Sequence, residues 1–409
     1  LKSNTIRLPQ PERIDIMSQY YYIEDLLELK GVRVTNVDNN PKETKITIEC
    51  PVSTHVCPSC GENTNRVHDY RLQVIKDIPI HTKPTFLVYR RRRYKCIHCQ
   101  KRFSENNDFV AKYQHKTSRL NLFILDKLKN LVSMSFISKE FHVSIPTVAR
   151  IMDTVEKSKP KHLPNVLSID EFKGNFGFGK YQCILTDPSN RKVLDIIPTR
   201  TEAHLHAYFR QYPYDERKRV SFVVIDMWRP YYSCMSRLFP KAKIIIDRFH
   251  FIRQINWALE NVRKREQKHL SKPLRIHFKN SKKLLNMKYS RVHINDYWKL
   301  NKMFEISSDL KIAHQLKEDF YFVMASKDSV EARIRLNDWI DIAKASELKE
   351  YEAAIRAFNN WKEPILNSFD HPYSNGYTEG FNNKIKVLKR ISFGLRNFER
   401  SRNRILHLI

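Results

Sequence analysis

Short, continuous apolar runs between residues 165 and 250 predict buried strands. Val166–Asp170 and Val220–Asp226 are the clearest, because each is almost wholly apolar and ends in an acidic residue. Runs of this length are typical of strands that are covered on both faces. The same pattern predicts three further strands and one helix, which are Tyr181–Thr186, Lys192–Pro198, Ala242–Asp247 and, as the helix, Glu202–Tyr212.

The order of these elements indicates a fold class. Three strands, a helix, a strand, a helix and a strand follow one another, which predicts a ribonuclease H-like α/β core. Residues 250–370 differ, because they are rich in Lys and Arg and poor in strand signals. We expect an all-helical insertion there. A turn at Pro372–Gly376 then leads into a basic helix from Thr378 to Arg390.

Three helix-like segments precede the core, between residues 115 and 157. In the first, leucines at every third position from Leu122 to Leu131 form one predicted face. Ser144 is the expected N-cap of the third helix. The unit resembles a helix-turn-helix whose last helix enters the major groove. This reading predicts three DNA contacts, which are Ser144, Thr147 and Arg150.

The chain is therefore expected to be multidomain α+β. The predicted order is an N-terminal segment (1–49), a zinc-ribbon-like module (50–112), a helix-turn-helix domain (113–160), the first part of the ribonuclease H-like core (161–250), the helical insertion (251–370) and the C-terminal helix of the core (371–409). Leu1 stands where a starting Met is usual, so the completeness of the termini is left open.

Composition narrows the class of partner. Lys and Arg number 73 against 44 Asp and Glu, which gives a formal net charge of +29. Such an excess favours a polyanion, because each neutralised phosphate releases condensed counterions. We expect a nucleic acid as the partner. A membrane partner is not expected, since no amphipathic anchor or long apolar run is present.

Four of the seven cysteines form two C-x-x-C pairs, Cys57 with Cys60 and Cys96 with Cys99. Two such turns supply four thiolates, the set that closes a tetrahedral zinc site. We expect one Zn²⁺ per chain. The 35 residues between the pairs exceed the usual zinc-ribbon spacing, and a strand hairpin can account for them. Alternative ligands nearby are Cys50, His55 and His98.

A run of arginines leads directly into the second cysteine pair. Alternate residues of a strand project to opposite faces, so at most half of the run can meet one phosphate track. The predicted DNA contacts are Arg90, Arg91, Arg92 and Arg93.

Three acids are the candidate catalytic residues. Asp170 and Asp226 end strands that are neighbours in a ribonuclease H-like sheet, and Glu379 begins a helix after the insertion. Three carboxylates can hold two Mg²⁺ (or Mn²⁺) ions about 3.5–4 Å apart, which suits in-line displacement at phosphorus. Hard oxygen ligands fit these ions, whereas thiolates fit zinc. Asp247 is the main rival, with helix capping as its alternative role.

Basic and aromatic residues around the acids complete the predictions. Asn383, Lys386 and Arg390 share a helix face with Glu379, so we expect them to contact DNA. His250 is expected to orient a phosphate or a carboxylate, or to pack. Four tryptophans are expected in the core of the insertion, which are Trp257, Trp298, Trp339 and Trp361.

The motifs together resemble a known family. The runs that carry the resemblance to DDE transposases are Ser168–Phe172, Val223–Trp228, Ser374–Lys386, Lys389–Arg390 and Gly394–Phe398. From about Cys57 to Ile409 the chain is similar to the ISL-three family of bacterial insertion-sequence transposases, which combine a zinc-binding N-terminus, a helix-turn-helix and a DDE domain.

The resemblance implies a function. It implies Asp170, Asp226 and Glu379 as the catalytic triad, binding to the terminal inverted repeats of the element, and cut-and-paste movement into target DNA without ATP. It also implies double-stranded DNA as the partner, the bacterial cytoplasm in association with the nucleoid as the location, and a homodimer in the DNA complex, because two ends are cut in coordination. Two alternatives are kept: a transposase-derived DNA-binding regulator without cleavage activity, and a structure-specific nuclease on the same core.

Overall fold

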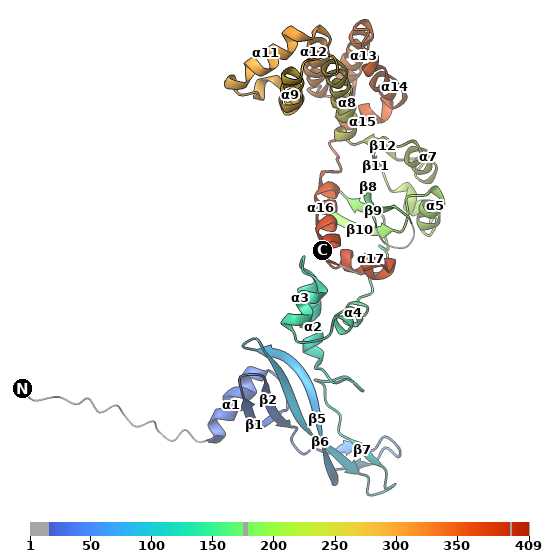
Figure 1. Ribbon diagram of the computed structural model, residues 1–409. Helices are drawn as coiled ribbons and strands as arrows, with labels where there is room; N and C mark the ends of the chain where they lie inside the picture. The colour runs from blue at the N-terminus through green and yellow to red at the C-terminus, as the bar shows by residue number, and fades with distance from the viewer. Residues whose placement is uncertain (1–15, 175–178, 393–394, 409) are drawn as a thin grey trace, which may run out of the picture. The chain divides into compact units, whose positions relative to one another are not determined.

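The computed structural model describes residues 16–174, 179–392 and 395–408. Leu1, Gly394 and Ile409, which the sequence analysis named, lie outside the described residues. The chain divides into two compact units (Figure 1). The first unit is built mainly from residues up to 156, and the second mainly from residues 157 to 407.

A five-stranded sheet forms much of the first unit. Its elements are α1 (Ile16–Leu27), β1 (Arg33–Asn39), β2 (Thr44–Glu49), β3 (His55–Val56), β4 (Asn63–Thr64), β5 (Val67–Ile80), β6 (Lys83–Lys95) and β7 (Arg102–Ser104). The strand order is β1-β2-β6-β5, with β7 paired to β6, while β3 and β4 form a separate two-stranded sheet. The parallel pair of β2 and β6 places Ile46 opposite Leu87, and both are buried. The predicted segments 1–49 and 50–112 therefore share one sheet.

The long hairpin of β5 and β6 occupies the sequence between the two cysteine pairs. Its strands are antiparallel, with Ile75 opposite Leu87. The strand hairpin that the wide cysteine spacing predicted is thus present. Near its turn the hairpin packs its apolar residues into the sheet core, whereas its other end carries the arginine run.

Three short helices follow, α2 (Ser118–Leu128), α3 (Met134–Glu140) and α4 (Ile145–Met152). The Ser144 hydroxyl accepts a hydrogen bond from the Thr147 backbone N–H, so Ser144 is the N-cap of α4 as predicted. The predicted face of α2 was only partly right, since Leu128 is buried and Leu125 packs against the core, but the other predicted leucines do neither. Its buried residues are Leu120, Ile124 and Leu128, and Leu122 is 65% exposed.

The sheet of the second unit mixes both strand directions. Its elements begin with β8 (Val166–Lys173), β9 (Tyr181–Asp187), β10 (Lys192–Ile197), α5 (Glu202–Phe209), α6 (Tyr214–Lys218), β11 (Phe222–Ile225), α7 (Arg229–Leu238) and β12 (Lys243–Ile246). The order is β10-β9-β8-β11-β12. Strands β8, β9 and β10 pair antiparallel, whereas β11 runs parallel to both β8 and β12.

The two faces of this sheet have different neighbours. Leu167 and Ile169 of β8 join the apolar core that contains α5 and α7. The alternate residue Ser168 faces the helix α16 (Gly376–Ile391), which lies on the other side of the sheet (Figure 1). Because side chains alternate along a strand, Asp170 lies on the α16 face as well.

Only helices occur between β12 and α16, a stretch that the structure describes throughout. They are α8 (Arg248–Gln267), α9 (Lys272–Asn280), α10 (Lys282–Asn286), η1 (Tyr289–Arg291), η2 (Ile294–Asp296), α11 (Tyr297–Ile306), α12 (Ser308–Met324), α13 (Ser329–Ala345), η3 (Lys349–Tyr351), α14 (Glu352–Asn360) and α15 (Lys362–Asp370); α17 (Phe398–Leu406) follows α16. The tryptophan prediction was half right. Trp339 and Trp361 are buried, but Trp257 and Trp298 are 52% and 56% exposed.

A buried histidine in α12 gives the helical region a sensitivity to acid. Burial, together with the charge of Lys317, lowers the pKa of His314 to about 3. Lys317 donates from Nζ to His314 Nε2 at 3.3 Å, which holds the ring neutral. In the unfolded chain the ring binds a proton below about pH 6.5. Stability is therefore present above pH 6.5 and is lost as the pH falls toward 3.

We expect the wild-type second unit to lose about 2 kcal/mol more stability between pH 7 and pH 5 than His314→Gln, because Gln cannot titrate. Urea unfolding followed by tryptophan fluorescence reports this unit, since all five tryptophans lie in it. Equal acid sensitivity in the two proteins would contradict the prediction.

Candidate functional site

Three acids from separate elements line one cavity of the second unit. Asp170 lies in β8, Asp226 directly follows β11, and Glu379 lies in the first turn of α16. The cavity has a volume of about 480 Å³, and all three side chains contribute to its wall. The sequence pattern predicts that Asp170 ends its strand. It lies inside the strand instead, because β8 continues to Lys173.

Hydrogen bonds hold two of the carboxylates in fixed orientations. Asp170 accepts from the Glu171 backbone N–H at 2.6 Å and from Asn382 Nδ2 at 2.8 Å. Asp226 Oδ1 lies 2.9 Å from His250 Nε2 and 3.4 Å from Asn375 Nδ2. One oxygen of Asp226 thus has partners, while both oxygens of Asp170 have one each.

The electrostatics of the cavity fit a cation. Burial, together with the charge of Asp226, raises the pKa of Asp170 to about 7. Burial and the charge of Asp247 raise the pKa of Glu379. Ionising all of these carboxylates is therefore unfavourable, and a bound divalent cation would stabilise their ionised form. The donor atoms are the hard oxygens that Mg²⁺ and Mn²⁺ prefer. The buried oxygen Oδ1 of Asn382 also has no hydrogen-bond partner.

The three carboxylates are not drawn together into a single tight cluster. Among the described residues, only the four cysteines bring three or more metal-ligating atoms within 4.8 Å of one another. Two ions that share a wall of acids do not require such a cluster, because each ion needs only part of the set. The fit to divalent cations therefore depends on donor chemistry, burial and charge.

The turn before α16 places Glu379, and Asn375 is its central residue. Asn375 accepts a hydrogen bond on Oδ1 from the Ser168 hydroxyl at 2.5 Å, and its backbone N–H donates to Asp247 Oδ2 at 2.6 Å. Asp247 also caps α8, the alternative role considered for it, and it is not among the residues that line the cavity. Sequence reasoning missed Asn375 and Asn382, although both lie within the run that carries the third acid.

Two basic residues of the cavity wall, His250 and Arg253, form a chain of contacts to Asp226. Burial alone would lower the pKa of His250, but the hydrogen bond and charge of Asp226 raise it above the ordinary value. Arg253 Nη2 lies 3.1 Å from His250 Nδ1. When the ring is neutral, Nδ1 accepts from Arg253 and Nε2 donates to Asp226. Of the three roles considered for His250, orienting a carboxylate is the one that the geometry supports.

The predicted residues on α16 are divided by the structure. Asn383 and Lys386 line the cavity with Glu379, and Lys386 donates to Asn383 at 3.3 Å. Arg390 is exposed on the same helix, but it is not part of the cavity wall. The lysine and arginine side chains at the wall of the cavity are Lys173, Arg253 and Lys386.

The four predicted zinc ligands converge in the first unit. Their sulfur atoms all lie within 4.8 Å of one another, with 3.5 Å between Cys57 and Cys99 and 3.5 Å between Cys60 and Cys96. A tetrahedron with Zn–S bonds of about 2.3 Å requires sulfurs about 3.8 Å apart, so the cluster fits zinc. The alternative ligands Cys50, His55 and His98 are outside it.

Comparison with known proteins identifies the family. A family model for ISL3 DDE transposases, described as "Transposase", matches residues 167–405, which is more than half of the chain. The chain belongs to the ISL3 transposase family. Two further models match its first unit: the zinc-finger of transposase IS204/IS1001/IS1096/IS1165 over residues 53–99 and the helix-turn-helix domain of transposase family ISL3 over residues 105–155.

Two curated proteins are similar to this ISL3 transposase. The transposase for insertion sequence element IS1001 of Bordetella parapertussis is 25% identical over 90% of this chain and 92% of its own length. A protein named ATP-dependent protease from Lactococcus lactis subsp. lactis is 29% identical, but over only 31% of this chain and 39% of its own. The longer similarity and the family model agree on a transposase.

Asn382 is expected to act as a positioning residue for the transposase, because it donates to Asp170 across the cavity. Partners that orient a metal-binding side chain contribute about 10–100-fold to activity or metal affinity. We expect Asn382→Ala to lower DNA cleavage by roughly that factor and to raise the Mn²⁺ concentration for half-maximal rate, with DNA affinity unchanged. A loss of rate that no Mn²⁺ concentration reduces would assign Asn382 to folding instead.

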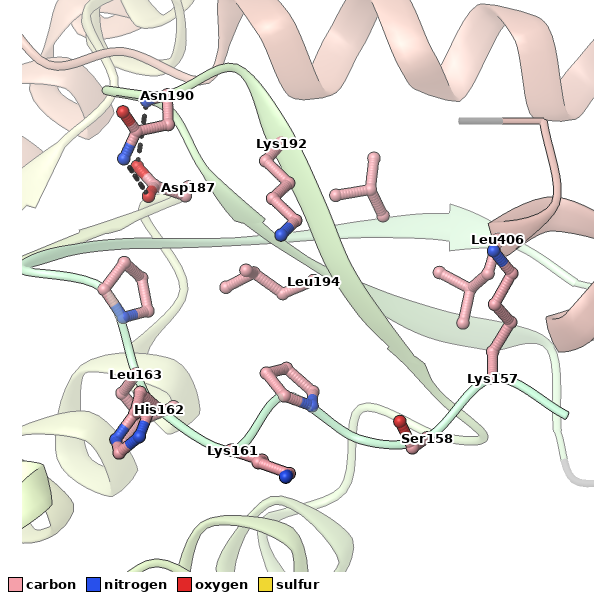
Figure 2. Close-up of a pocket in the computed structure, with 13 residues that line it drawn as sticks. Lys157, Ser158, Lys161, His162, Leu163, Asp187, Asn190, Lys192, Leu194 and Leu406 are labelled. Carbon is pink, nitrogen blue, oxygen red and sulfur yellow. Dashed lines mark hydrogen bonds between the residues drawn. The ribbon is translucent and has the colours of Figure 1, made fainter.

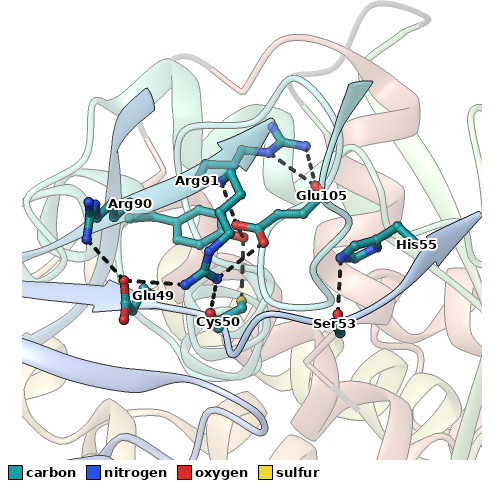
Figure 3. Close-up of polar contacts among 9 residues, drawn as sticks. Glu49, Cys50, Ser53, His55, Arg90, Arg91 and Glu105 are labelled. Atoms are coloured by element: carbon teal, nitrogen blue, oxygen red, sulfur yellow. Dashed lines mark hydrogen bonds and ion pairs between the residues drawn. The ribbon is translucent and has the colours of Figure 1, made fainter. Parts of the chain in front are cut away.

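The arginine run of the transposase has two distinct sides. Arg90 and Arg92 both pair with Glu49 at 3.5 Å, whereas Arg91 donates to the backbone carbonyl of Glu105 at 2.9 Å (Figure 3). Arg92 is 4% exposed, so its predicted DNA contact is corrected: its guanidinium is committed to Glu49 and to the Cys50 carbonyl.

The predicted DNA contacts of the helix-turn-helix lie along one side of α4, from its N-cap Ser144 to Arg150 in its last turn. The Ser144 and Thr147 hydroxyls are 2.9 Å apart, and Arg150 Nη2 donates to Thr147 Oγ1 at 3.2 Å. Ser144 and Arg150 are exposed, and Thr147 is half-buried. This side of the helix is therefore open to a partner.

A larger cavity of the second unit lies elsewhere. It has a volume of about 680 Å³ and is lined in part by Lys157, Lys161 and Lys192 (Figure 2). Its acid, Asp187, is bonded to Asn190 and closes the turn between β9 and β10. Because no acids converge there, size alone would have selected the wrong cavity.

No helix in the part of the chain that the structure describes is long and apolar enough to cross a membrane.

Proposed function

We propose that this ISL3 transposase binds the terminal inverted repeats of an insertion sequence and catalyses metal-dependent DNA cleavage and strand transfer. One observation carries the proposal: Asp170, Asp226 and Glu379, from three separate elements, line a single cavity. Burial raises the pKa of two of them, as expected for carboxylates that await a cation.

The sheet order supports a ribonuclease H-like core. Three antiparallel strands followed by two parallel ones, in the order β10-β9-β8-β11-β12, are the arrangement expected of that core. The helices between β12 and α16 would then be an insertion that separates the third acid from the first two. The proposal keeps the domain limits expected from the sequence, which are 161–250, 251–370 and 371–409.

The three acids would hold two Mg²⁺ or Mn²⁺ ions. Such ions, when bound, activate the attacking oxygen and stabilise the leaving oxygen. Asn382 and His250 orient two of the carboxylates. Lys386 and Arg253, at the cavity wall, hold the phosphate that is attacked.

Two displacements at phosphorus follow one another in this proposal. In the first, a water oxygen bonds to phosphorus and the bond to the 3′-oxygen breaks, which leaves a 3′-hydroxyl at the element end. In the second, that hydroxyl attacks a phosphodiester of target DNA and displaces its 3′-oxygen. Each step exchanges one P–O bond for another, so ATP is not required.

DNA recognition is assigned to the first unit. Helix α4, with Ser144, Thr147 and Arg150, enters the major groove in this proposal, and one Zn²⁺ on the four cysteines holds the neighbouring module. A homodimer on the DNA is proposed because two ends of the element are processed together.

A DNA fragment carrying the element's ends, incubated with the protein and Mg²⁺, tests the proposal. Strand-transfer products are the expected result. Cleavage without joining would indicate a nuclease on the same core, and binding without cleavage would indicate a transposase-derived regulator. Either outcome would overturn the proposed function.

A further inference from the structure

We propose that the β5–β6 hairpin carries a phosphate-binding site, formed by Arg71, Arg91 and Arg93, that extends the DNA contact surface of α4. The inference rests on the DNA-binding part of the proposed function. It adds a site that the sequence pattern did not contain, because Arg71 comes from the other strand of the hairpin.

The pairing of the two strands places like charges together. Arg71 lies directly opposite Arg91 in the antiparallel register, an arrangement that destabilises a sheet unless an anion intervenes. Arg71, Arg91 and Arg93 line one cavity of about 380 Å³, with Ser104 and His115 at its wall. Arg90 and Arg92, which alternate with them on β6, are not part of this wall.

These three guanidinium groups are only partly neutralised. Arg93 pairs with Asp69 at 3.1 Å. Arg91 donates two hydrogen bonds, from Nε and Nη2, to the Glu105 backbone carbonyl, which carries no charge. Among the described residues, no carboxylate lies within 4.0 Å of either Arg71 or Arg91. The cavity therefore holds an excess of positive charge and free planar donors, which suit the oxygens of a phosphate.

A second cavity connects this site to the helix-turn-helix. It shares Val74 and His115 with the arginine cavity, and its wall includes Lys76, Lys116, Ser144 and Thr147. Basic residues thus follow the surface from the hairpin to the first turn of α4. This continuity favours the backbone of a duplex over an isolated anion, because one strand can pass from the arginines to the helix that reads its bases.

The salt dependence of DNA binding tests the inference. The logarithm of the affinity falls with the logarithm of salt concentration by about 0.9 for each phosphate contact. With the full chain and a fluorescent duplex of arbitrary sequence, we expect Arg71→Gln and Arg91→Gln each to reduce this slope by about 0.9. Arg71→Lys keeps the charge, so its slope should equal that of the wild type.

Arg33→Gln is the matched control. Arg33 is exposed on β1, the edge of the same sheet opposite to β5, so the variant loses the same charge away from the site. Its slope should equal that of the wild type. Zinc content, measured for every variant, shows whether the unit has kept its fold.

The outcomes separate the inference from the proposed function. Wild-type binding with unchanged slopes in folded Arg71→Gln and Arg91→Gln would overturn the phosphate site alone. An equal reduction in Arg33→Gln would also overturn it, since the effect would then reflect net charge. No duplex binding by the wild type would overturn the DNA-binding function itself. Binding of a poly-glutamate peptide that depends on Arg71, with duplex binding unaffected, would assign the site to an acidic protein partner.

Discussion

Asp226→Asn is expected to abolish DNA cleavage while the protein still binds element ends. In the wild type, His250 Nε2 lies 2.9 Å from Asp226 Oδ1. Asn keeps the size of the side chain and an oxygen for His250, but it removes the charge that holds a divalent cation. Bound metal ions supply several kcal/mol of transition-state stabilisation, and each 1.4 kcal/mol is about tenfold in rate. The cleavage rate with Mg²⁺ should therefore fall by about a thousandfold or more.

Glu379→Gln should behave in the same way, because its carboxylate lines the same cavity. The control is Asp215→Asn, which removes a carboxylate whose side chain is 92% exposed in the same unit. Cleavage by that variant should equal the wild type. An Asp226→Asn protein that is folded and cuts at a normal rate would remove Asp226 from the active site.

Cys96→Ser is expected to release zinc and to unfold the zinc module. The Cys96 sulfur lies 3.5 Å from that of Cys60, and a serine oxygen cannot replace a thiolate at this position. Structural zinc contributes about 10–16 kcal/mol of apparent binding energy in small zinc modules. Zinc content should fall from one ion per chain toward zero, and end binding should fall with it.

Cys50→Ser provides the matched control, since Cys50 lies outside the cysteine cluster and contacts Tyr89. It should retain one zinc. A wild-type protein without stoichiometric zinc would contradict the assumption that the four cysteines hold one ion. Full zinc content in Cys96→Ser would show that another residue completes the site.

The positions of the acids and cysteines could be predicted because each sits in a strong local pattern. Asp170 and Asp226 come at or near the end of short apolar runs. Few structures other than a buried strand suit such a run, so the place of each acid follows from it. The C-x-x-C pairs define tight turns whatever separates them. These signals depend on neighbours in the sequence, and the structure places the residues as they suggested.

Side-chain exposure was harder to predict because it depends on what packs against an element. In α2, leucines at every third position suggested a face, but the core takes the i, i+4, i+8 row of Leu120, Ile124 and Leu128. Trp257 and Trp298 are exposed, although Trp298 still contacts the His277 ring of α9 at 5.9 Å between ring centroids. Composition contains no information of this kind.

Partners from distant segments could not be foreseen at all. Asn382 donates to Asp170, and Arg92 reaches Glu49, across separations that no local pattern records. In the sequence, Arg92 is indistinguishable from the other arginines of its run. In the structure it is buried and pairs with Glu49 of β2, so its role is structural.

The order of functional parts along the chain has a consequence for its synthesis. The zinc and helix-turn-helix parts leave the ribosome first, whereas Glu379 follows the whole series of helices from α8 to α15. A polypeptide that stops within those helices would carry the DNA-binding parts without the last acid. Under the proposed function, such a fragment would occupy the ends of the element without cutting them, and it would compete with intact protein for the same sites. Premature termination would therefore produce an inhibitor of movement, not a weaker enzyme.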